Sequence, residues 1–298
     1  MRERRVGFES LSNSRFGIGL ALGVSRATPP SVGHWLARGV AGRLVRNPDS
    51  PMIRAYRANQ WMASGRTLSG EELDDAVRET IATSGRFLYD VYHLPEGREP
   101  LMRAIVVNDD FERLLRAPDN GPVVFAGVHL GNFDLMGWAL SYSGLKAQTL
   151  SVSDPNGGYQ WQNELRKKAG MEITPVSIEA LKQAARCLRD GGSVLTGLDR
   201  PQPDVAEDRR PRFFGEPSNA PLLHVRLAMR AKVPVVVLSS FLRPDGRYEA
   251  IASDPIPMES ADQIENAERC LSFAEQIIRR APTQWAMPHA VWPQIVAP

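Results

Sequence analysis

The 298-residue sequence predicts an α/β fold in which helices flank a mostly parallel central sheet, preceded by a helical N-terminal extension. Two observations carry this prediction. Beyond residue 120, strand-like runs alternate with helix-like stretches, as a parallel sheet with crossover helices requires. Before residue 95, apolar residues recur at helical spacing. The chain has no internal repeat, so we expect one compact domain, with residues 1–95 packing as an extension on an α/β core of residues 96–298.

The individual elements follow from local patterns. Six runs rich in apolar and β-branched residues are expected to be strands: 123–128, 148–152, 172–176, 193–198, 233–241 and 248–252. Five stretches with helical periodicity are expected between and after them: 134–143, 159–169, 178–189, 221–231 and 261–281. In the extension, 31–45 should be a helix that ends before Asn47-Pro48, and Ser69 followed by Gly-Glu-Glu should open another.

Composition excludes several classes of protein. The 36 basic and 34 acidic residues leave a net charge of +2, which argues against nucleic acid as a partner. Cys187 and Cys270 are far apart in sequence, so neither a disulfide framework nor a zinc cluster is expected. No apolar run approaches the roughly 20 residues that span a bilayer, which favours a soluble or peripheral protein. Neither a nucleotide phosphate loop nor a serine-hydrolase elbow occurs.

The segment GVHLGNFDLMGW, residues 127–138, is the strongest candidate for chemistry. His129 follows an apolar strand, Gly131 permits a turn, and Asn132 can cap a helix with Asp134 in its first turn. Asp134 would then hold Nδ1 of His129 and leave Nε2 free as a base. The alternative is a structural histidine beside an acid that the helix dipole favours.

Several segments together resemble a known family. The spacing His129-x4-Asp134 resembles the HX4D signature of glycerolipid-type acyltransferases, and His-Leu-Gly-Asn-Phe-Asp is most similar to the family of lipid A late acyltransferases and phosphatidylinositol mannoside acyltransferases. Gly-Leu-Asp-Arg at 197–200, Arg-Phe-Phe-Gly-Glu-Pro at 212–217 and Pro-Thr-Gln-Trp at 282–285 resemble further segments of that family, in order and spacing. Asp134 matches the mannoside and glycerolipid pattern, whereas lipid A members usually carry glutamate there, so the acceptor lipid stays open.

The resemblance implies an enzyme of lipid biosynthesis that moves a fatty acyl group from acyl-CoA or acyl carrier protein to a hydroxyl of a glycolipid or phospholipid. It requires no cofactor and no metal. His129 is the expected base, Asp134 orients it, and Asp199 matches a second acidic position that either assists His129 or pairs with Arg200. The expected substrate-binding residues are Asn132, Arg200, Arg209, Arg210 and Arg212. The three arginines at 209–212 are alternatively a solvated charge run.

Lipid substrates imply a membrane surface as a partner, with the protein peripheral on the cytoplasmic face of the cell inner membrane. Segments 16–24 and 32–45 are expected either to lie in the membrane interface or to cover the sheet or a dimer contact. The basic run at 166–168 is expected to face solvent. Two other functions remain open: a metal-dependent hydrolase with His129, Asp134 and Asp199 as ligands, and a non-catalytic lipid-binding protein on the same scaffold.

Overall fold

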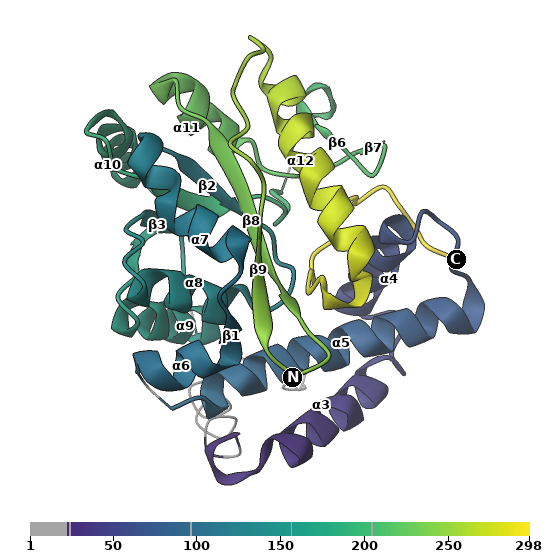
Figure 1. Ribbon diagram of the computed structural model, residues 1–298. Coiled ribbons are helices and arrows are strands. Elements are labelled where there is room, and N and C mark those ends of the chain that lie inside the picture. The colour runs from purple at the N-terminus through teal and green to yellow at the C-terminus, as the bar shows by residue number, and fades with distance from the viewer. Residues whose placement is uncertain (1–22, 24, 96, 156, 204) are drawn as a thin grey trace, which may run out of the picture.

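The computed structural model describes residues 23–298 apart from 24, 96, 156 and 204, and it has a seven-stranded central sheet (Figure 1). The strand order is β1-β9-β8-β2-β5-β3-β4. All neighbouring strands run parallel except β8 and β9, which pair antiparallel as a hairpin. The predicted α/β class with a mostly parallel sheet is therefore confirmed. The strands are β1 (Ile105–Val106), β2 (Val124–Gly127), β3 (Gln148–Ser151), β4 (Glu172–Pro175), β5 (Val194–Gly197), β8 (Val235–Leu242) and β9 (Tyr248–Ala252).

Helices cover both faces of this sheet, and the central strand shows why. Side chains alternate between faces along a strand, and β2 and its flanks are apolar on both. Val124, Ala126 and Val128 pack into one cluster, while Val123 and Phe125 pack into the other. The first cluster is covered by α10 (Ile178–Arg189), α11 (Leu223–Ala231) and α12 (Gln263–Arg280). The second is covered by α6 (Arg98–Ala104), α7 (Asp109–Arg116), α8 (Phe133–Tyr142) and α9 (Gly157–Lys168).

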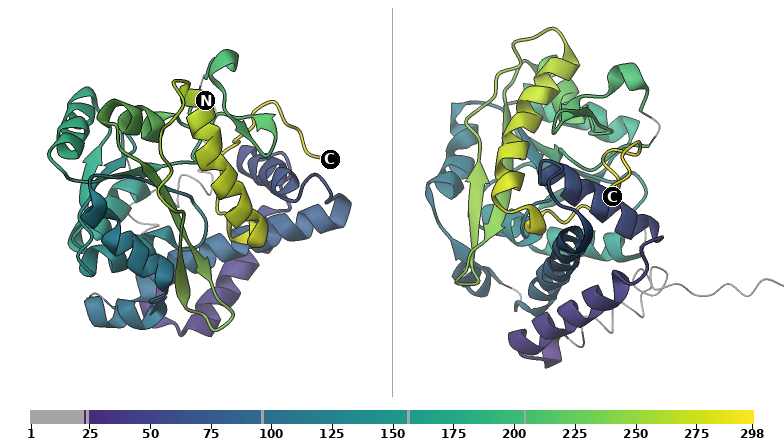
Figure 2. Two further views of the ribbon diagram at one scale, coloured as in Figure 1. Left: turned by 45° about the horizontal axis from the view of Figure 1, so that its top comes forward. Right: turned by 90° about the vertical axis from the view of Figure 1, so that its right-hand side faces the viewer.

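In the part of the chain that the structure describes, the helices α3 (Pro30–Leu44), α4 (Pro51–Ala63) and α5 (Gly70–His93) precede α6 and the sheet. The 24-residue α5 crosses the lower end of the sheet, and α3 lies outside it (Figures 1 and 2). Met62 of α4 packs in the first cluster and Phe87 of α5 in the second, so the extension contributes to the core on both faces. A division of the chain at residue 95 stays a prediction.

The six strands and the helices expected from the sequence are present, with ends shifted by a few residues. Elements without a counterpart among the expected ones include α4, α6, α7 and the two-residue β1. A small second sheet pairs β6 (Arg212–Phe213) with β7 (Glu216–Pro217). Within the described residues, no helix is both long and apolar enough to cross a membrane. The expected interfacial segment 16–24 lies outside the described residues except for Gly23.

Candidate active site

The site forms where two neighbouring strands end. β2 and β5 pair in parallel with Gly127 opposite Gly197. His129 and Asp199 therefore occupy equivalent positions, each two residues beyond a paired glycine. Gly197 lies against the imidazole, since a Cβ built on it would sit 3.7 Å from Cε1 of His129. The carboxyl edge of a parallel sheet is the usual place for sites in open α/β folds.

Asp199 holds the imidazole of His129. The Nδ1 atom of His129 lies 2.6 Å from Oδ1 of Asp199, and the backbone N–H of His129 donates to Oδ2 at 3.0 Å. The indole N–H of Trp285 donates to the same Oδ2 at 2.8 Å. Asp199 is fully buried, whereas 22% of the His129 side chain is exposed. Because a carboxylate accepts and does not donate, the neutral ring carries its proton on Nδ1, and Nε2 has a free lone pair.

The expectation that Asp134 orients His129 is wrong in the structure. Asp134 sits in the first turn of α8, and its Oδ1 accepts a hydrogen bond from Nε of Arg166 at 2.6 Å. Arg166 lies on α9, which packs beside α8. The position at Nδ1 of His129 is already filled by Asp199, so Asp134 binds the neighbouring helix instead. Phe133, which precedes Asp134 in the chain, has its ring edge-on to the imidazole of His129 at a centroid distance of 4.9 Å.

Arg166 is buried, although the sequence predicted a solvent-facing basic run. Its side chain is 9% exposed, and its Nη1 donates to Asn163 at 2.9 Å. The guanidinium also lies over the rings of Phe133 and Tyr159. Burial opposes the charge, but the Asp134 carboxylate outweighs it, so the pKa of Arg166 is raised above its ordinary value. Each charge of this pair therefore depends on the other.

Arg200 and His289 lie close to His129. The Arg200 guanidinium stacks over Tyr159 at 5.4 Å and forms no ion pair with a carboxylate of the described residues. Burial, then the charges of Arg200 and His129, lower the pKa of His289, which places that ring near both. Arg200 is therefore available to an anionic group.

Asn132 does not present its side chain to a ligand, contrary to its predicted substrate-binding role. It is buried, its oxygen caps α8 at the Leu135 N–H, and its Nδ2 donates to the carbonyl of Phe87 on α5 at 3.0 Å. The predicted cap is confirmed. The predicted turn at Gly131 is also present, with φ of +63°. A Cβ there would overlap the backbone carbonyl of Ser240 on β8, so this position has no space for a side chain.

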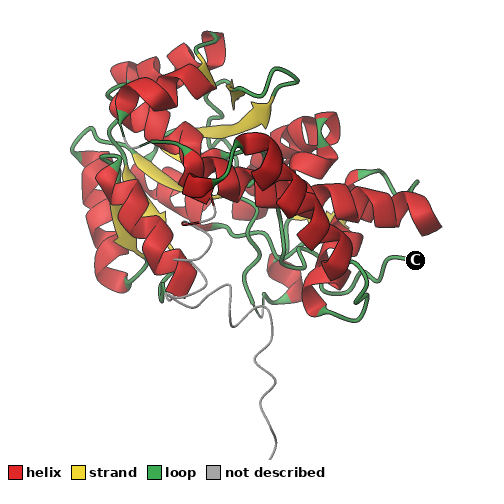
Figure 3. Cartoon of the chain, turned by 90° about the horizontal axis from the view of Figure 1, so that it is seen from below, coloured by secondary structure: helices red, strands yellow, loops and turns green. Residues whose placement is uncertain are grey.

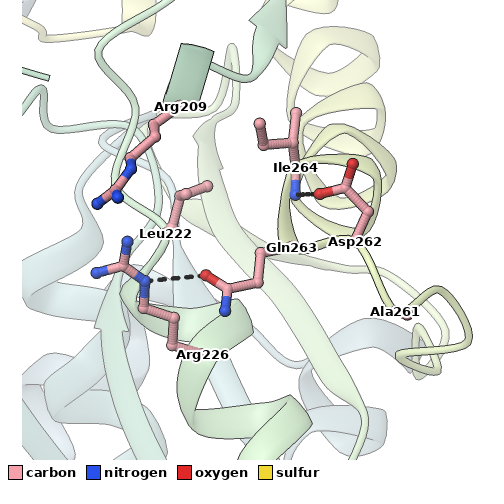
Figure 4. Close-up of a pocket in the computed structure, with 7 residues that line it drawn as sticks. All are labelled: Arg209, Leu222, Arg226, Ala261, Asp262, Gln263 and Ile264. Carbon is pink, nitrogen blue, oxygen red and sulfur yellow. Dashed lines mark hydrogen bonds between the residues drawn. The ribbon is translucent and has the colours of Figure 1, made fainter. Parts of the chain in front are cut away.

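Of the arginines at 209–212, Arg209 lies far from His129. Arg209 lines a cavity of about 570 Å³ between the start of α11 and the start of α12, opposite Arg226 (Figure 4). Arg210 donates to the carbonyl of Val205 and Arg212 to that of Gly215. Trp285 follows the other end of α12, and at 1.5 Å per residue the 18-residue helix separates its two ends by about 27 Å. Their role in substrate binding remains a prediction without support from this geometry.

Trp285 is the main site residue that sequence reasoning missed, because the sequence showed it only as part of the Pro-Thr-Gln-Trp segment. Its segment pairs with that of His129: the Gly131 N–H donates to Gln284, and the Ala286 N–H donates to the His129 carbonyl. Trp285 also packs in an aromatic cluster with Phe213, Phe214 and Trp292. The signal was present in the sequence, since an indole N–H that is buried requires an acceptor.

The predicted ligand set of a metal-dependent hydrolase does not converge. Both oxygens of Asp199 already accept hydrogen bonds, and the Asp134 carboxylate binds Arg166. Among the described residues, no group of three or more histidine, cysteine, aspartate or glutamate side chains is arranged to hold a metal ion. The arrangement instead suits a proton-transfer role for His129.

Fold and site together define a class: an α/β protein in which a buried carboxylate orients a solvent-accessible histidine, an arrangement that suits a general base. A model of the family described as bacterial lipid A biosynthesis acyltransferase matches residues 16–294. Since that match spans nearly the whole sequence, the chain belongs to this acyltransferase family. Its members act in lipid biosynthesis, so the chain is an acyltransferase with a lipid-type acceptor. No curated protein matches the chain.

Proposed function

We propose that this acyltransferase moves a fatty acyl group from an acyl thioester, acyl-CoA or acyl carrier protein, to a hydroxyl of a glycolipid or phospholipid. We further propose that it works at the cytoplasmic face of the cell inner membrane as a peripheral protein. The observation that carries the proposal is the geometry of His129 and Asp199 in a chain of this family. Acyl transfer to an alcohol needs a base at the attacking oxygen, and Nε2 of His129 carries a free lone pair that can serve as this base.

Each step uses groups in the site. Nε2 of His129 takes the proton of the acceptor hydroxyl as its oxygen attacks the thioester carbonyl. Asp199 stabilises the imidazolium that forms, because its Oδ1 already accepts from Nδ1. The tetrahedral intermediate then collapses, the carbon–sulfur bond breaks, and the thiolate takes the proton from Nε2. The ester is the product, and no covalent intermediate with the enzyme is required.

Arg200 is the group we assign to substrate binding. A lipid head group and CoA both carry phosphate, and an arginine that pairs with no carboxylate of the described residues can bind phosphate through two parallel hydrogen bonds. Its stacking on Tyr159 holds the guanidinium directly after Asp199 in the chain without using its N–H donors. Arg200→Lys keeps the charge but loses the planar fork, so it should raise KM more than it lowers kcat.

The test is acyl transfer by the purified full chain, with acyl-CoA or acyl carrier protein as donor and bacterial lipid extract as acceptor. Mass spectrometry should show a lipid heavier by one acyl group. His129→Ala should reduce the rate by about 10²–10⁴, the usual contribution of a positioned base. Arg116→Ala is a control, since that side chain is exposed and pairs with Glu112 on α7. Native activity in His129→Ala would show that this histidine is not the base.

A further inference from the structure

Helix α3 exposes its largest apolar residues. Val32, Trp35, Leu36 and Val40 all face solvent, and 69% of Trp35 is exposed. At 3.6 residues per turn, these four side chains fall within roughly 140° of the helix circumference. We call them the α3 face. Figure 2 shows α3 at the edge of the molecule, and Figure 3 views the chain from this side.

The small and polar residues of α3 face the protein instead. Gly33 packs against the ring of Tyr89, and Ala37 lies against Gly85 of α5. His34 bonds to Asp90 of α5 at 2.9 Å. A helix that buries a hydrophobic stripe normally directs its large apolar residues to the core. Here the attachment to α5 uses glycine, alanine and histidine, so the α3 face is held outward by specific contacts.

Helix α3 itself carries arginine but neither aspartate nor glutamate. Residues 11–48 contain five arginines and neither aspartate nor glutamate. Of these, Arg43 is on the outward arc of α3, and Arg46 follows the helix; both are exposed. Acidic residues do lie on the neighbouring α5, where Glu79 faces Arg38 at 3.9 Å. Apolar side chains flanked by arginine are the composition of a helix that lies in the interface of an anionic bilayer.

The candidate active site lies close to this face. α5 separates α3 from the loop of His129: Tyr89 contacts α3, and two residues earlier the Phe87 carbonyl accepts from Asn132 in that loop. Packed helices lie about 8–10 Å apart, so only about two helix layers separate the outer side of α3 from the loop.

From these observations we infer that the α3 face docks on an anionic lipid bilayer, with Trp35 in the interface, and so brings the lipid acceptor to the site. A second copy of the chain is the competing occupant. The delivery of a lipid acceptor rests on the proposed function, whereas the docking does not, because docking on a bilayer needs no catalysis.

The first experiment measures sedimentation of the full chain with vesicles of phosphatidylcholine alone and with an equimolar mixture of phosphatidylcholine and phosphatidylglycerol. The native chain should partition into the mixed vesicles, and Trp35→Ser with Leu36→Ser should lower the partition coefficient roughly tenfold or more. Arg43→Gln should lower it about fivefold, on the mixed vesicles only. Ile178→Ser is the matched control, because Ile178 is an equally exposed apolar residue on α10 and should change nothing.

A second measurement reports on Trp35 directly. Lipids brominated on their acyl chains should quench tryptophan fluorescence of the native chain more than that of Trp35→Phe. Equal quenching, or equal sedimentation of native and double-serine chains, would overturn the inference. So would a native dimer that the serine variant converts to a monomer while vesicle binding is unchanged, since a second copy would then cover the face.

The docking and the proposed function can fail separately. His129→Ala should bind vesicles as the native chain does. A native chain that docks on vesicles but transfers no acyl group would refute only the proposed function. The double-serine variant should keep native activity on acceptor dispersed in detergent micelles and lose at least tenfold on acceptor held in vesicles. Native activity of that variant on vesicles would refute only the docking.

Discussion

Replacing Asp199 by asparagine should reverse the protonation of His129. Both fixed donors, the His129 backbone N–H and the Trp285 indole, point at Oδ2 of Asp199. The asparagine oxygen must therefore take the Oδ2 position, which puts its NH₂ group 2.6 Å from Nδ1 of His129. Two N–H groups cannot face each other at that distance, so Nδ1 becomes the acceptor and the ring proton moves to Nε2. The ring then has no free lone pair for the acceptor hydroxyl.

The expected loss in kcat is on the order of 10³–10⁴, comparable to the same change in the serine-protease triad. That corresponds to about 4–5 kcal/mol of transition-state stabilisation. Acyl transfer at saturating substrate gives kcat, and ¹⁵N chemical shifts of the imidazole report which nitrogen carries the proton. The free energy of unfolding should change little, because the oxygen that Trp285 binds is retained.

Asp245→Asn is the matched control, since Asp245 is a carboxylate in the exposed turn between β8 and β9 and should leave kcat unchanged. The reasoning about Asp199 is refuted if Asp199→Asn retains kcat within tenfold of native. It is also refuted if the ¹⁵N spectrum still shows the proton on Nδ1.

Three further predictions concern stability, measured by urea unfolding. Asp134→Ala should cost about 3 kcal/mol, because it leaves Arg166 buried without its partner; Asp134→Ala with Arg166→Met should recover most of this, and a single-variant cost below about 1 kcal/mol would contradict it. Gly131→Ala should cost more than about 2 kcal/mol, because a Cβ at positive φ overlaps the Ser240 carbonyl; a native free energy of unfolding would show that the turn can shift. His224 is fully buried, and burial lowers its pKa from 6.5 to about 4. The unfolded chain therefore binds this proton first, so stability is full above pH 6.5 and falls by about 3 kcal/mol as the pH drops toward 4. His224→Leu should lose that part of the pH dependence, and an unchanged profile would exclude His224 as its source.

The alternation of strands and helices could be predicted from the sequence because the central strands are apolar on both faces and the helices have apolar residues at a 3.6-residue period. Strand order was not readable. Asp199 follows β5, the fourth strand of the expected set, and nothing local to it shows that β5 is the neighbour of β2. That adjacency, with Gly127 opposite Gly197, decides which carboxylate meets His129.

The prediction that Asp134 orients His129 was wrong for a related reason. Spacing along the chain made it the nearest acid to His129, and the turn at Gly131 made contact feasible. Its actual partner, Arg166, is 32 residues away on another helix. A sequence pattern indicates whether a helix face is exposed or buried, but it does not indicate which helix packs against that face. The burial of Arg166 could therefore not be predicted. The composition of α3 was equally ambiguous, because an apolar helix face normally indicates core.

The contacts around His129 and Asp199 are completed by a segment that follows every strand of the sheet in the chain. Residues near 129 form a β-bridge with Trp285, more than 150 positions later, and the indole of that residue completes the environment of Asp199. During synthesis, the sheet strands through β9 leave the ribosome before this last segment. The imidazole and its carboxylate thus acquire their full set of contacts only after the segment of Trp285 has emerged, so a nascent chain that already has its sheet does not yet have the complete site.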